Sequence, residues 1–454
     1  MRRLTTTLVI VLILASFVLG HAARQSYKAR FEPTTTKMPF GGRTAYEPGT
    51  TRSDVGSRSD IDLRPMETFS LVLRYLNQHY VEQIEESRRK DLTYGTLQNM
   101  LDSLKDPYTR FLEPKQKQLV EAAREGRFQG IGAVFGVRRI TNEDGVFEQL
   151  TVVSVLPGSQ AEKAGVKNGD VVAELDGKTV LSYDPLQRTR RLLKAERNGE
   201  ITRDELIQQL EIEDAKIKDG IMFQKAADRL SAPFEDTCEL TLLRGDKTAK
   251  VKVASAELEI EPVRHYVKDG IGYLYINLFS TSAPDKVAAA LADIRKKDAT
   301  GLVLDVRSNP GGSVTSAMEV ARLFAPDKDF AVLSRSAERE EILKIPPARP
   351  QDNASIWTKP VVVLVDGGTA SAAELLAGAL RDAYGATLVG TRTFGLGLEI
   401  TMLPQRDGSA VEMTTGKFFT PSGKDFHTKG LSVDTEIADP EAQLARAKAL
   451  AKSG

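Results

Sequence analysis

The chain has 454 residues, of which 41% are hydrophobic and 27% charged, so it is long enough for two or three domains, each with its own core. Lys plus Arg and Asp plus Glu both number 62, so net charge gives no reason to expect nucleic acid or an anionic membrane surface as a partner. The single cysteine, Cys238, excludes an intrachain disulfide and any multi-cysteine metal site. Its strand-like surroundings predict a buried structural thiol.

The N-terminus has the pattern of an export signal. Two arginines precede an apolar run from Leu8 to Gly20, and small residues stand at Gly20 and Ala22. The run is shorter than the ~20 residues of a full membrane span. This pattern predicts a secretory signal peptide over residues 1–23, with an uncleaved membrane anchor as the alternative. In both cases we expect an exported protein, in the periplasm or on the outer face of the cytoplasmic membrane.

Two segments follow the N-terminal signal. Residues 24–60 are rich in Thr, Arg, Ser, Gly and Pro and have no apolar periodicity, which predicts a disordered linker. From Met66 onward, apolar side chains recur at i, i+3 and i+4, and two further helical patterns follow. Residues 61–125 are therefore predicted to form a small helical N-terminal domain.

The next stretch, residues 126–257, has the pattern of a small β domain. The glycine-rich loop "RFQGIGAVFG" leads into alternating strands and two hairpins, one with an Asp-Gly turn. Residues 183–222, approximately, interrupt it with a charged segment of helical pattern, which we interpret as a helical insertion.

The last part of the chain alternates between strands and helices. Near-continuous apolar strands and amphipathic helices over residues 258–437 predict an α/β core around a largely parallel sheet. Residues 438–454 predict a C-terminal helix, which we expect to be exposed to solvent. The fold class expected is therefore a multidomain α/β protein.

Two turns in this core follow apolar strands, at the ends where α/β folds place their sites. In "DVRSNPGG", Gly311 and Gly312 would free backbone N–H groups for an anion or an oxyanion, and a plain strand-to-helix turn is the alternative. In "DGGTASAAE", Ser371 falls at the start of a helix. It is either a nucleophile or an N-cap, and Glu374 fits a capping box.

A nucleophilic serine needs a base. His79, His265 and His427 have no surrounding pattern that marks a catalytic histidine, which does not favour a Ser-His-Asp triad. A lysine is the other common base, because burial lowers its pKa. No cluster of metal ligands occurs along the chain, so we expect no metal and no organic cofactor.

The chain from about Phe69 to Asp434 resembles the carboxyl-terminal processing peptidases of family S41. "RFQGIGAVFG" and "VLPGSQAEKAGVKNGDVVAELDGK" resemble their PDZ domain. "GLVLDVRSNPGGSV", "VVVLVDGGTASAAELLAGALRDA" and "GATLVGTRTFG" resemble their catalytic core, and "TTGKFFTPSGK" and "KGLSVD" resemble the family's closing motifs. The resemblance implies a PDZ-like β domain, a ClpP/crotonase-like α/β core, and C-terminal tails of proteins as partners.

The resemblance also implies roles for single residues. The family's nucleophile falls on Ser371, supported by Glu374, and its oxyanion donors fall on the backbone of Ala372 and of the Gly311–Gly312 loop. The PDZ loop would receive a substrate's C-terminal carboxylate by strand addition, through Gly130, Ile131, Gly132 and Ala133.

The sequence departs from the family's pattern at the general base. The family has a lysine in a T-F-G-K-G turn and a glutamine four residues later, where this chain has Leu396 and Ile400. Glu399 and Lys417 are nearby groups that could replace the missing general base. Two alternatives stay open: a serine endopeptidase acting on C-terminal tails, and an inactive pseudoprotease that serves as a tail-binding adaptor or regulator. Membrane association through the N-terminal segment and oligomerisation are also left open.

Overall fold

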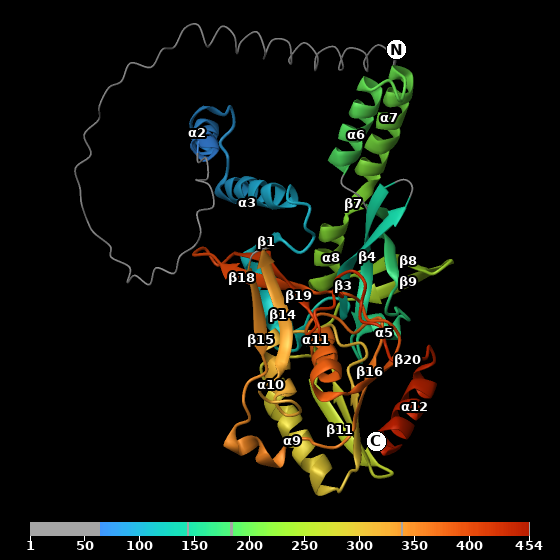
Figure 1. Ribbon diagram of the computed structural model, residues 1–454. Helices are drawn as coiled ribbons and strands as arrows, with labels where there is room; N and C mark the ends of the chain where they lie inside the picture. Colours follow the sequence, from blue (N-terminus) through green and yellow to red (C-terminus); the bar gives the residue numbers. More distant parts are fainter. Residues whose placement is uncertain (1–63, 143–144, 182–184, 337–338, 454) are drawn as a thin grey trace, which may run out of the picture. The chain divides into compact units, whose positions relative to one another are not determined.

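The computed structural model describes residues 64–142, 145–181, 185–336 and 339–453 (Figure 1). The predicted signal segment (1–23) and linker (24–60) lie outside these residues. The chain divides into two compact units, Met1–Gln83 and Ile84–Gly454. In the first unit, the described residues form helix α2 (Arg64–His79). No helix in the described part of the chain combines the length and the apolar character needed to cross a membrane.

The second unit begins with a short mixed segment made of α3 (Glu86–Asp102), β1 (Arg110–Leu112), α4 (Pro114–Arg124) and β2 (Arg127–Phe128). α4 begins with a proline at its first position, and the Glu113 N–H donates to the Gln116 side chain (2.9 Å), which satisfies a donor at the helix start. β1 pairs with β19 (Ala410–Phe419) of the core, so this segment is joined to the core by a strand ladder.

The β domain is a seven-stranded sheet with the order β3-β4-β5-β6-β7, in which β8 pairs with β5 and β9. Its interior is one apolar cluster that includes Ile131, Leu230 and Cys238. Cys238 is buried in this cluster, as predicted, and burial raises the pKa of its thiol to about 11. The elements are β3 (Ala133–Asn142), β4 (Gly145–Val155), α5 (Gln160–Lys163), β5 (Val171–Leu175), β6 (Lys178–Leu181), β7 (Gly220–Met222), α8 (Phe223–Ser231), β8 (Thr237–Arg244) and β9 (Lys247–Ala254).

Between β6 and β7 the chain forms a helical hairpin made of α6 (Pro185–Arg197) and α7 (Arg203–Asp219). Gly199, with φ 74°, makes the turn between the two helices. The Thr202 side chain caps α7, and Glu205 completes the capping box. Figure 1 shows the hairpin extending away from the β7 end of the sheet.

The core contains a six-stranded sheet with the order β11-β12-β13-β16-β17-β20, parallel except for the β11–β12 pair. Its central strands β13 and β16 are buried along their whole length because both faces of the sheet are covered by helices. The elements are β11 (Val263–Lys268), β12 (Ile271–Ile276), α9 (Ala283–Lys296), β13 (Gly301–Asp305), α10 (Val314–Ala321), β16 (Val361–Val365), α11 (Ala372–Ala379), η2 (Leu380–Tyr384), β17 (Thr387–Gly390), β20 (Thr435–Glu436) and α12 (Pro440–Ser453).

The prediction of a solvent-exposed C-terminal helix is wrong. One face of α12 packs on the sheet, where Ala447 and Ala451 are fully buried against Tyr273 and Val362. Alanines one turn apart let the helix approach closely, and Gly301 leaves room for the Ala451 backbone. Charged side chains on the other faces of the helix hide this short apolar stripe in the sequence.

A second, five-stranded sheet stands beside the first and is formed by β14 (Asp329–Ser336), β15 (Arg339–Lys344), β18 (Leu398–Pro404), β19 (Ala410–Phe419) and β1. The short strand β10 (Leu258–Glu259) pairs with β2, and η1 (Pro350–Ala354) is a single turn before β16. The glycine turn that contains Leu396 leads directly into β18. The multidomain α/β fold predicted from the sequence is confirmed.

Candidate active site

Ser371 lies in the sharp turn between β16 and α11, one residue before the helix begins. Its backbone has φ 51° and ψ −119°. Such a conformation costs a non-glycine residue about 1–3 kcal/mol and persists only where the surroundings enforce it. Backbone hydrogen bonds hold both sides of it: Ala370 N–H donates to the Asn309 carbonyl (2.9 Å), and Leu375 N–H donates to the Ser371 carbonyl (3.0 Å). The turn therefore places the serine at the N-terminus of α11.

The glycine loop after β13 lies directly against this serine. A Cβ on Gly311, which has φ 107°, would stand 2.9 Å from the Ser371 Cβ and 3.2 Å from the Ala372 nitrogen. Only glycine allows this approach. The buried Asn309 side chain shapes the loop, because its Nδ2 donates to the Ile276 carbonyl and its Oδ1 accepts the Gly311 N–H, both at 2.8 Å.

The expected oxyanion donors differ in how they are engaged. The Gly311 N–H is occupied by Asn309. Gly312 forms a β-bridge with Phe279, in which the Phe279 N–H donates to the Gly311 carbonyl and the Ser313 N–H donates to the Phe279 carbonyl. The Gly312 N–H takes no part in this bridge. Ala372 is the first residue of α11, so its N–H has no partner within the helix. Ala372 and Gly312 are thus better placed to donate than Gly311.

Glu374 links the serine turn to the turn that contains Leu396. Its fully buried carboxylate accepts the N–H groups of Ser371 (3.0 Å), Gly395 (2.8 Å) and Leu396 (2.8 Å), and also the Thr393 hydroxyl. Burial raises the pKa of Glu374 to about 7, and the four donors act against this rise. One oxygen accepts both the Ser371 and the Leu396 N–H, so these two residues are held on the same group.

The Leu396 side chain packs on a small apolar cluster formed by Val153 of the β domain together with Ala370 and Phe394 of the core. Gly395 gives the turn its shape: it has φ 95°, and a Cβ there would stand 2.7 Å from the Gly430 nitrogen. Glu374 thus ties the Leu396 turn to the Ser371 turn, and the side chain at position 396 is apolar. A leucine can neither accept a proton nor form a hydrogen bond.

The two candidate substitute bases, Glu399 and Lys417, form hydrogen bonds and ion pairs with other residues. Glu399 accepts from Arg335 (2.9 Å) and from the Thr415 hydroxyl (2.7 Å). Lys417 forms an ion pair with Asp425 (3.1 Å). In the described part of the chain, neither forms a hydrogen bond or an ion pair with the Ser371 turn.

Ile400 lies on β18 opposite Thr414 and is half-buried. A β-bulge at this point places Thr415 as an extra residue on β19. Ile400, like Leu396, brings no polar atom to the site.

His427 is a titratable group next to the Leu396 turn, a position that the sequence pattern did not indicate. Its segment packs against the Leu396 turn, because Thr428 N–H donates to the Gly395 carbonyl (2.8 Å). Burial, helped by the positive charge of Lys417, lowers the pKa of His427. Its buried Nδ1 has no hydrogen-bond partner among the described residues. The short spacing in "GKDFHTKG" gave no signal of this placement, since the contact joins segments more than thirty residues apart.

The other two described histidines stand on different elements. His265 pairs with Asp293 (3.0 Å) on β11 and α9, in an open surface pocket of about 450 Å³ that Glu261 and Lys286 also line. His79 is exposed on α2, as its position off the apolar stripe predicts. Within the described residues, no group of three or more His, Cys, Asp or Glu side chains could hold a metal ion.

The predicted peptide-binding loop stands at the edge of the β domain. Gly130 and Gly132 have φ 85° and 75°, and Ile131 N–H donates to the Leu230 carbonyl at the end of α8 (3.0 Å). The Ile131 donor is therefore occupied. Ala133 begins β3, which pairs with β4 on one edge only in the described part of the chain.

The Ala133 N–H faces the open edge of β3. Leu156 N–H donates to the Gly132 carbonyl (3.0 Å), and Val155 N–H donates to Asn168 (2.9 Å) instead of to Ala133. In an antiparallel ladder this pattern turns the Ala133 backbone outward, on the side where α8 lies. The Ala133 N–H and carbonyl therefore make no ladder hydrogen bond with β4.

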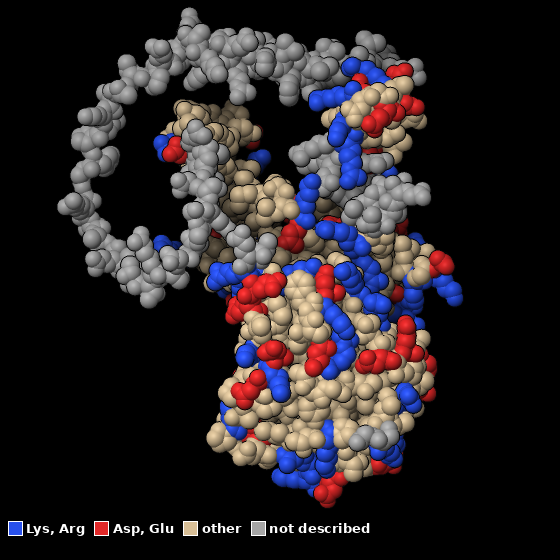
Figure 2. All heavy atoms as spheres, viewed as in Figure 1, with Lys and Arg blue, Asp and Glu red and all other residues tan. Residues whose placement is uncertain are grey.

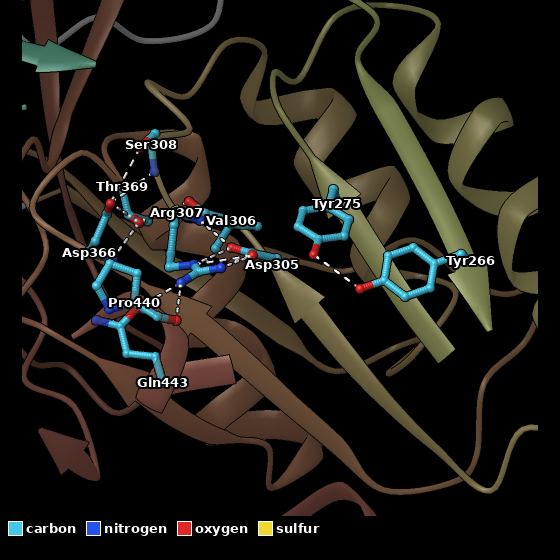
Figure 3. Close-up of polar contacts among 10 residues, drawn as sticks. All are labelled: Tyr266, Tyr275, Asp305, Val306, Arg307, Ser308, Asp366, Thr369, Pro440 and Gln443. Carbon is cyan, nitrogen blue, oxygen red and sulfur yellow. Dashed lines mark hydrogen bonds and ion pairs between the residues drawn. The ribbon is translucent and has the colours of Figure 1, made fainter. Parts of the chain in front are cut away.

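Ser308 joins the β domain to the glycine loop. Its carbonyl accepts the Ser154 hydroxyl (2.6 Å), and its own hydroxyl accepts from Asn168 (2.7 Å). On the core side, Ser308 N–H donates to Asp366 (2.8 Å), at the end of β16 (Figure 3). These hydrogen bonds hold the β domain to the core at Ser308, three residues before Gly311.

A buried ion pair fixes the strand end beneath this junction (Figure 3). Arg307 pairs with Asp305 and donates to the Pro440 carbonyl (3.1 Å) and to Gln443 (3.0 Å), which anchors α12. Burial raises the pKa of Asp305, and Arg307 opposes this rise. The sequence alone assigns no role to Asn309, to Thr393 or to the Asp305–Arg307 ion pair, because each acts through contacts with residues distant in the chain.

Comparisons with known proteins agree with this arrangement. Residues 270–437 match the model of peptidase family S41, and residues 151–204 match that of a PDZ domain. A carboxyl-terminal-processing protease of Synechocystis sp. is 30% identical over 371 residues, which cover 80% of this chain and 75% of that protein. A chloroplastic C-terminal processing peptidase of Tetradesmus obliquus is 30% identical over 367 residues, which cover 81% and 72%.

A solved structure supports the same relationship. The photosystem II D1 C-terminal processing protease superposes with a TM-score of 0.58 and 25% identity, covering 82% of this chain and 86% of that one.

Proposed function

Because the chain belongs to peptidase family S41, with a PDZ domain, we propose that it captures the C-terminal tails of exported proteins and that its Ser371 site does not cleave them. The protein then acts as a tail-binding adaptor or regulator built on a protease frame. The observation that carries this proposal is the Leu396 side chain, which packs on Val153, Ala370 and Phe394 where the family's pattern has a lysine.

Proton transfer decides the chemistry at Ser371. Attack by a serine hydroxyl requires that its proton be accepted, and general-base catalysis contributes about 10²–10⁴-fold. A nucleophile and its base act as a unit, so the loss of one costs nearly as much as the loss of both. Glu374, the nearest carboxylate, already accepts four hydrogen bonds and is fully buried. We therefore expect hydrolysis slower than that of an intact site by at least this factor.

Tail capture rests on the edge of β3. The outward Ala133 backbone offers the main-chain hydrogen bonds of strand addition, and the adjoining glycine loop would hold the terminal carboxylate. Apolar side chains on α8, including the half-buried Phe223 and Ala227, would face the added strand and favour an apolar last residue.

A binding measurement tests tail capture separately from chemistry. Fluorescence anisotropy would compare a labelled peptide that has an apolar C-terminal residue and a free carboxylate with the same peptide amidated. We expect the free acid to bind at least about tenfold more tightly, because a buried charged hydrogen bond is lost on amidation. Ser371→Ala should bind both peptides as the unmodified chain does. Equal affinity for the two peptides would contradict tail capture.

Export rests on the basic and apolar pattern of residues 1–23. We propose that the protein acts outside the cytoplasmic membrane, where its targets are exported proteins. N-terminal sequencing of the chain purified from its native compartment provides the test. A mature chain that begins near residue 24 supports a cleaved signal, and an intact Met1 in the membrane fraction supports an anchor. An intact chain in the cytosol would contradict export.

A further inference from the structure

The α6–α7 hairpin separates its charges between its two helices. α6 has five basic residues and one acidic residue, whereas α7 has six acidic residues and three basic residues. Figure 2 shows the basic side chains gathered along α6 and the acidic ones along α7. The separation is sharp in a chain whose net charge is zero. One hairpin thus presents a positive helix next to a negative helix.

The hairpin also leaves apolar side chains uncovered. Leu192 and Leu206 are buried between the two helices, but Leu193 is 39% exposed and Ile207 is 46% exposed. Two helices alone can bury only one stripe each, and helices of this length gain most of their stability from packing of an apolar face. Bundles complete such packing with further helices.

Exposed apolar and charged residues share stripes on both helices. On α6, Leu193 and Arg197 lie one turn apart, and both are exposed. On α7, Ile207 and Glu211 lie one turn apart, and both are exposed. Each stripe therefore combines an exposed apolar side chain with an exposed charge, which is positive on α6 and negative on α7.

We propose that a second copy of this chain covers the hairpin, with α6 of one copy packed against α7 of the other in a four-helix bundle. A two-fold symmetric contact makes every complementary pair twice, so positive α6 meets negative α7 in both directions. A partner of uniform charge would match one helix and be repelled by the other. The second copy matches both.

The size of the hairpin limits the strength of this contact. Helices of 13 and 17 residues are about 20 and 25 Å long, so two adjacent helices offer a footprint of roughly 400 Å² per copy. The total of about 800 Å² over both copies is below the roughly 1,200 Å² of a stable specific interface and falls among weak, transient contacts. The pairs lie at the surface, so salt screens them. We expect a weak dimer, with a dissociation constant of about 1–100 µM, that weakens as salt rises.

Charge reversal on one helix tests the contact. Variant A carries Arg191→Glu, Lys194→Glu and Arg197→Glu on α6, and variant B carries Glu211→Lys, Asp214→Lys and Asp219→Lys on α7; all six positions are exposed. Sedimentation equilibrium of the full-length chain in mild detergent gives the association constant. Either variant alone should dimerise at least about tenfold more weakly, because attractive pairs become repulsive twice over.

Mixing the two variants is the decisive arm. Variant A has two negative helices and variant B has two positive helices, so the mixture should regain a dimer that contains one copy of each. A misfolded hairpin could not regain it. Lys247→Glu, Lys250→Glu and Lys252→Glu on β9 impose the same charge change as variant A elsewhere on the domain and should leave dimerisation unchanged. A monomeric unmodified chain at about 100 µM, or a mixture no more associated than its parts, would overturn the proposal.

Discussion

At the scale of single residues, the site depends on what stands at position 396. Ser371, Glu374 and the surrounding glycines form a strained serine turn. Leu396 stands in the neighbouring turn, where its N–H donates to the Glu374 carboxylate. Sequence reasoning reached Ser371 and Leu396, because both stand in motifs that are local in the chain. It could not reach Thr393 or His427, whose contacts with the turn depend on how distant segments meet.

Leu396→Lys combined with Ile400→Gln should restore a base and the group that orients it. We expect Ser371-dependent hydrolysis of an unfolded substrate to rise by about 10²-fold or more over the unmodified chain. Leu398→Lys, at a half-buried leucine two residues further on, where β18 begins, is the matched control and should give no rise. A rise in the control, or none in the double variant, would show that position 396 does not limit the chemistry.

Burial of Glu374 makes a prediction about pH. Its pKa is raised from an ordinary 4.5 to about 7, so between these values the folded chain keeps a proton that the unfolded chain releases. The contribution of Glu374 to the free energy of unfolding is therefore present below about pH 4.5 and lost as pH rises through about 7, by at most about 1.4 kcal/mol per pH unit. Denaturant titrations across this range should show that Glu374→Gln removes that slope. An unchanged slope in the variant would contradict the assignment.

At the scale of elements, the strand and helix patterns of the core were predictable, because apolar strands and amphipathic helices differ clearly in period. The packed face of α12 was not, because its buried residues are alanines, which give a weak hydrophobic signal. The glycine turn before β18 was recognisable as a turn. Its contact with the 426–430 loop was not, because nothing in the local sequence encodes it.

Gly395→Ala tests how tightly this turn is fixed. A Cβ at Gly395 would meet the backbone nitrogens of Gly430 and Lys429 at 2.7 and 3.0 Å, in addition to the strain of φ 95°. We expect a loss of about 3 kcal/mol in the free energy of unfolding. Gly423→Ala has a similar φ of 79° with no atom within 4 Å, so it should cost only about 1 kcal/mol. Equal losses in chemical denaturation would show that the turn is not closely packed.

At the scale of the second compact unit, the β domain and the core meet at the site itself. Val153 packs with Phe394 and Leu396, and Ser154 and Asn168 hold Ser308. The sequence predicted both domains but not their contact, because interdomain packing leaves no periodic signal. Leu396 therefore adds apolar surface to this junction.

Phe394→Ala should loosen the junction. Removal of the buried ring leaves a cavity and costs about 3–5 kcal/mol, and we expect faster amide hydrogen exchange in β4 and in residues 393–397. Phe330→Ala, a buried phenylalanine in the interior of the core, should destabilise the chain similarly without a selective effect on β4. Equal exchange profiles for the two variants would count against a shared junction.

The central claim is that Ser371 stands in a binding site that does not cut. Mass spectrometry of an unfolded substrate with an apolar C-terminus, incubated with the unmodified chain, Ser371→Ala or His427→Ala, tests it most directly. We predict that the unmodified chain gives no more products than Ser371→Ala. Products that disappear in Ser371→Ala would contradict the claim, and their loss in His427→Ala as well would identify His427 as the base that replaces the lysine.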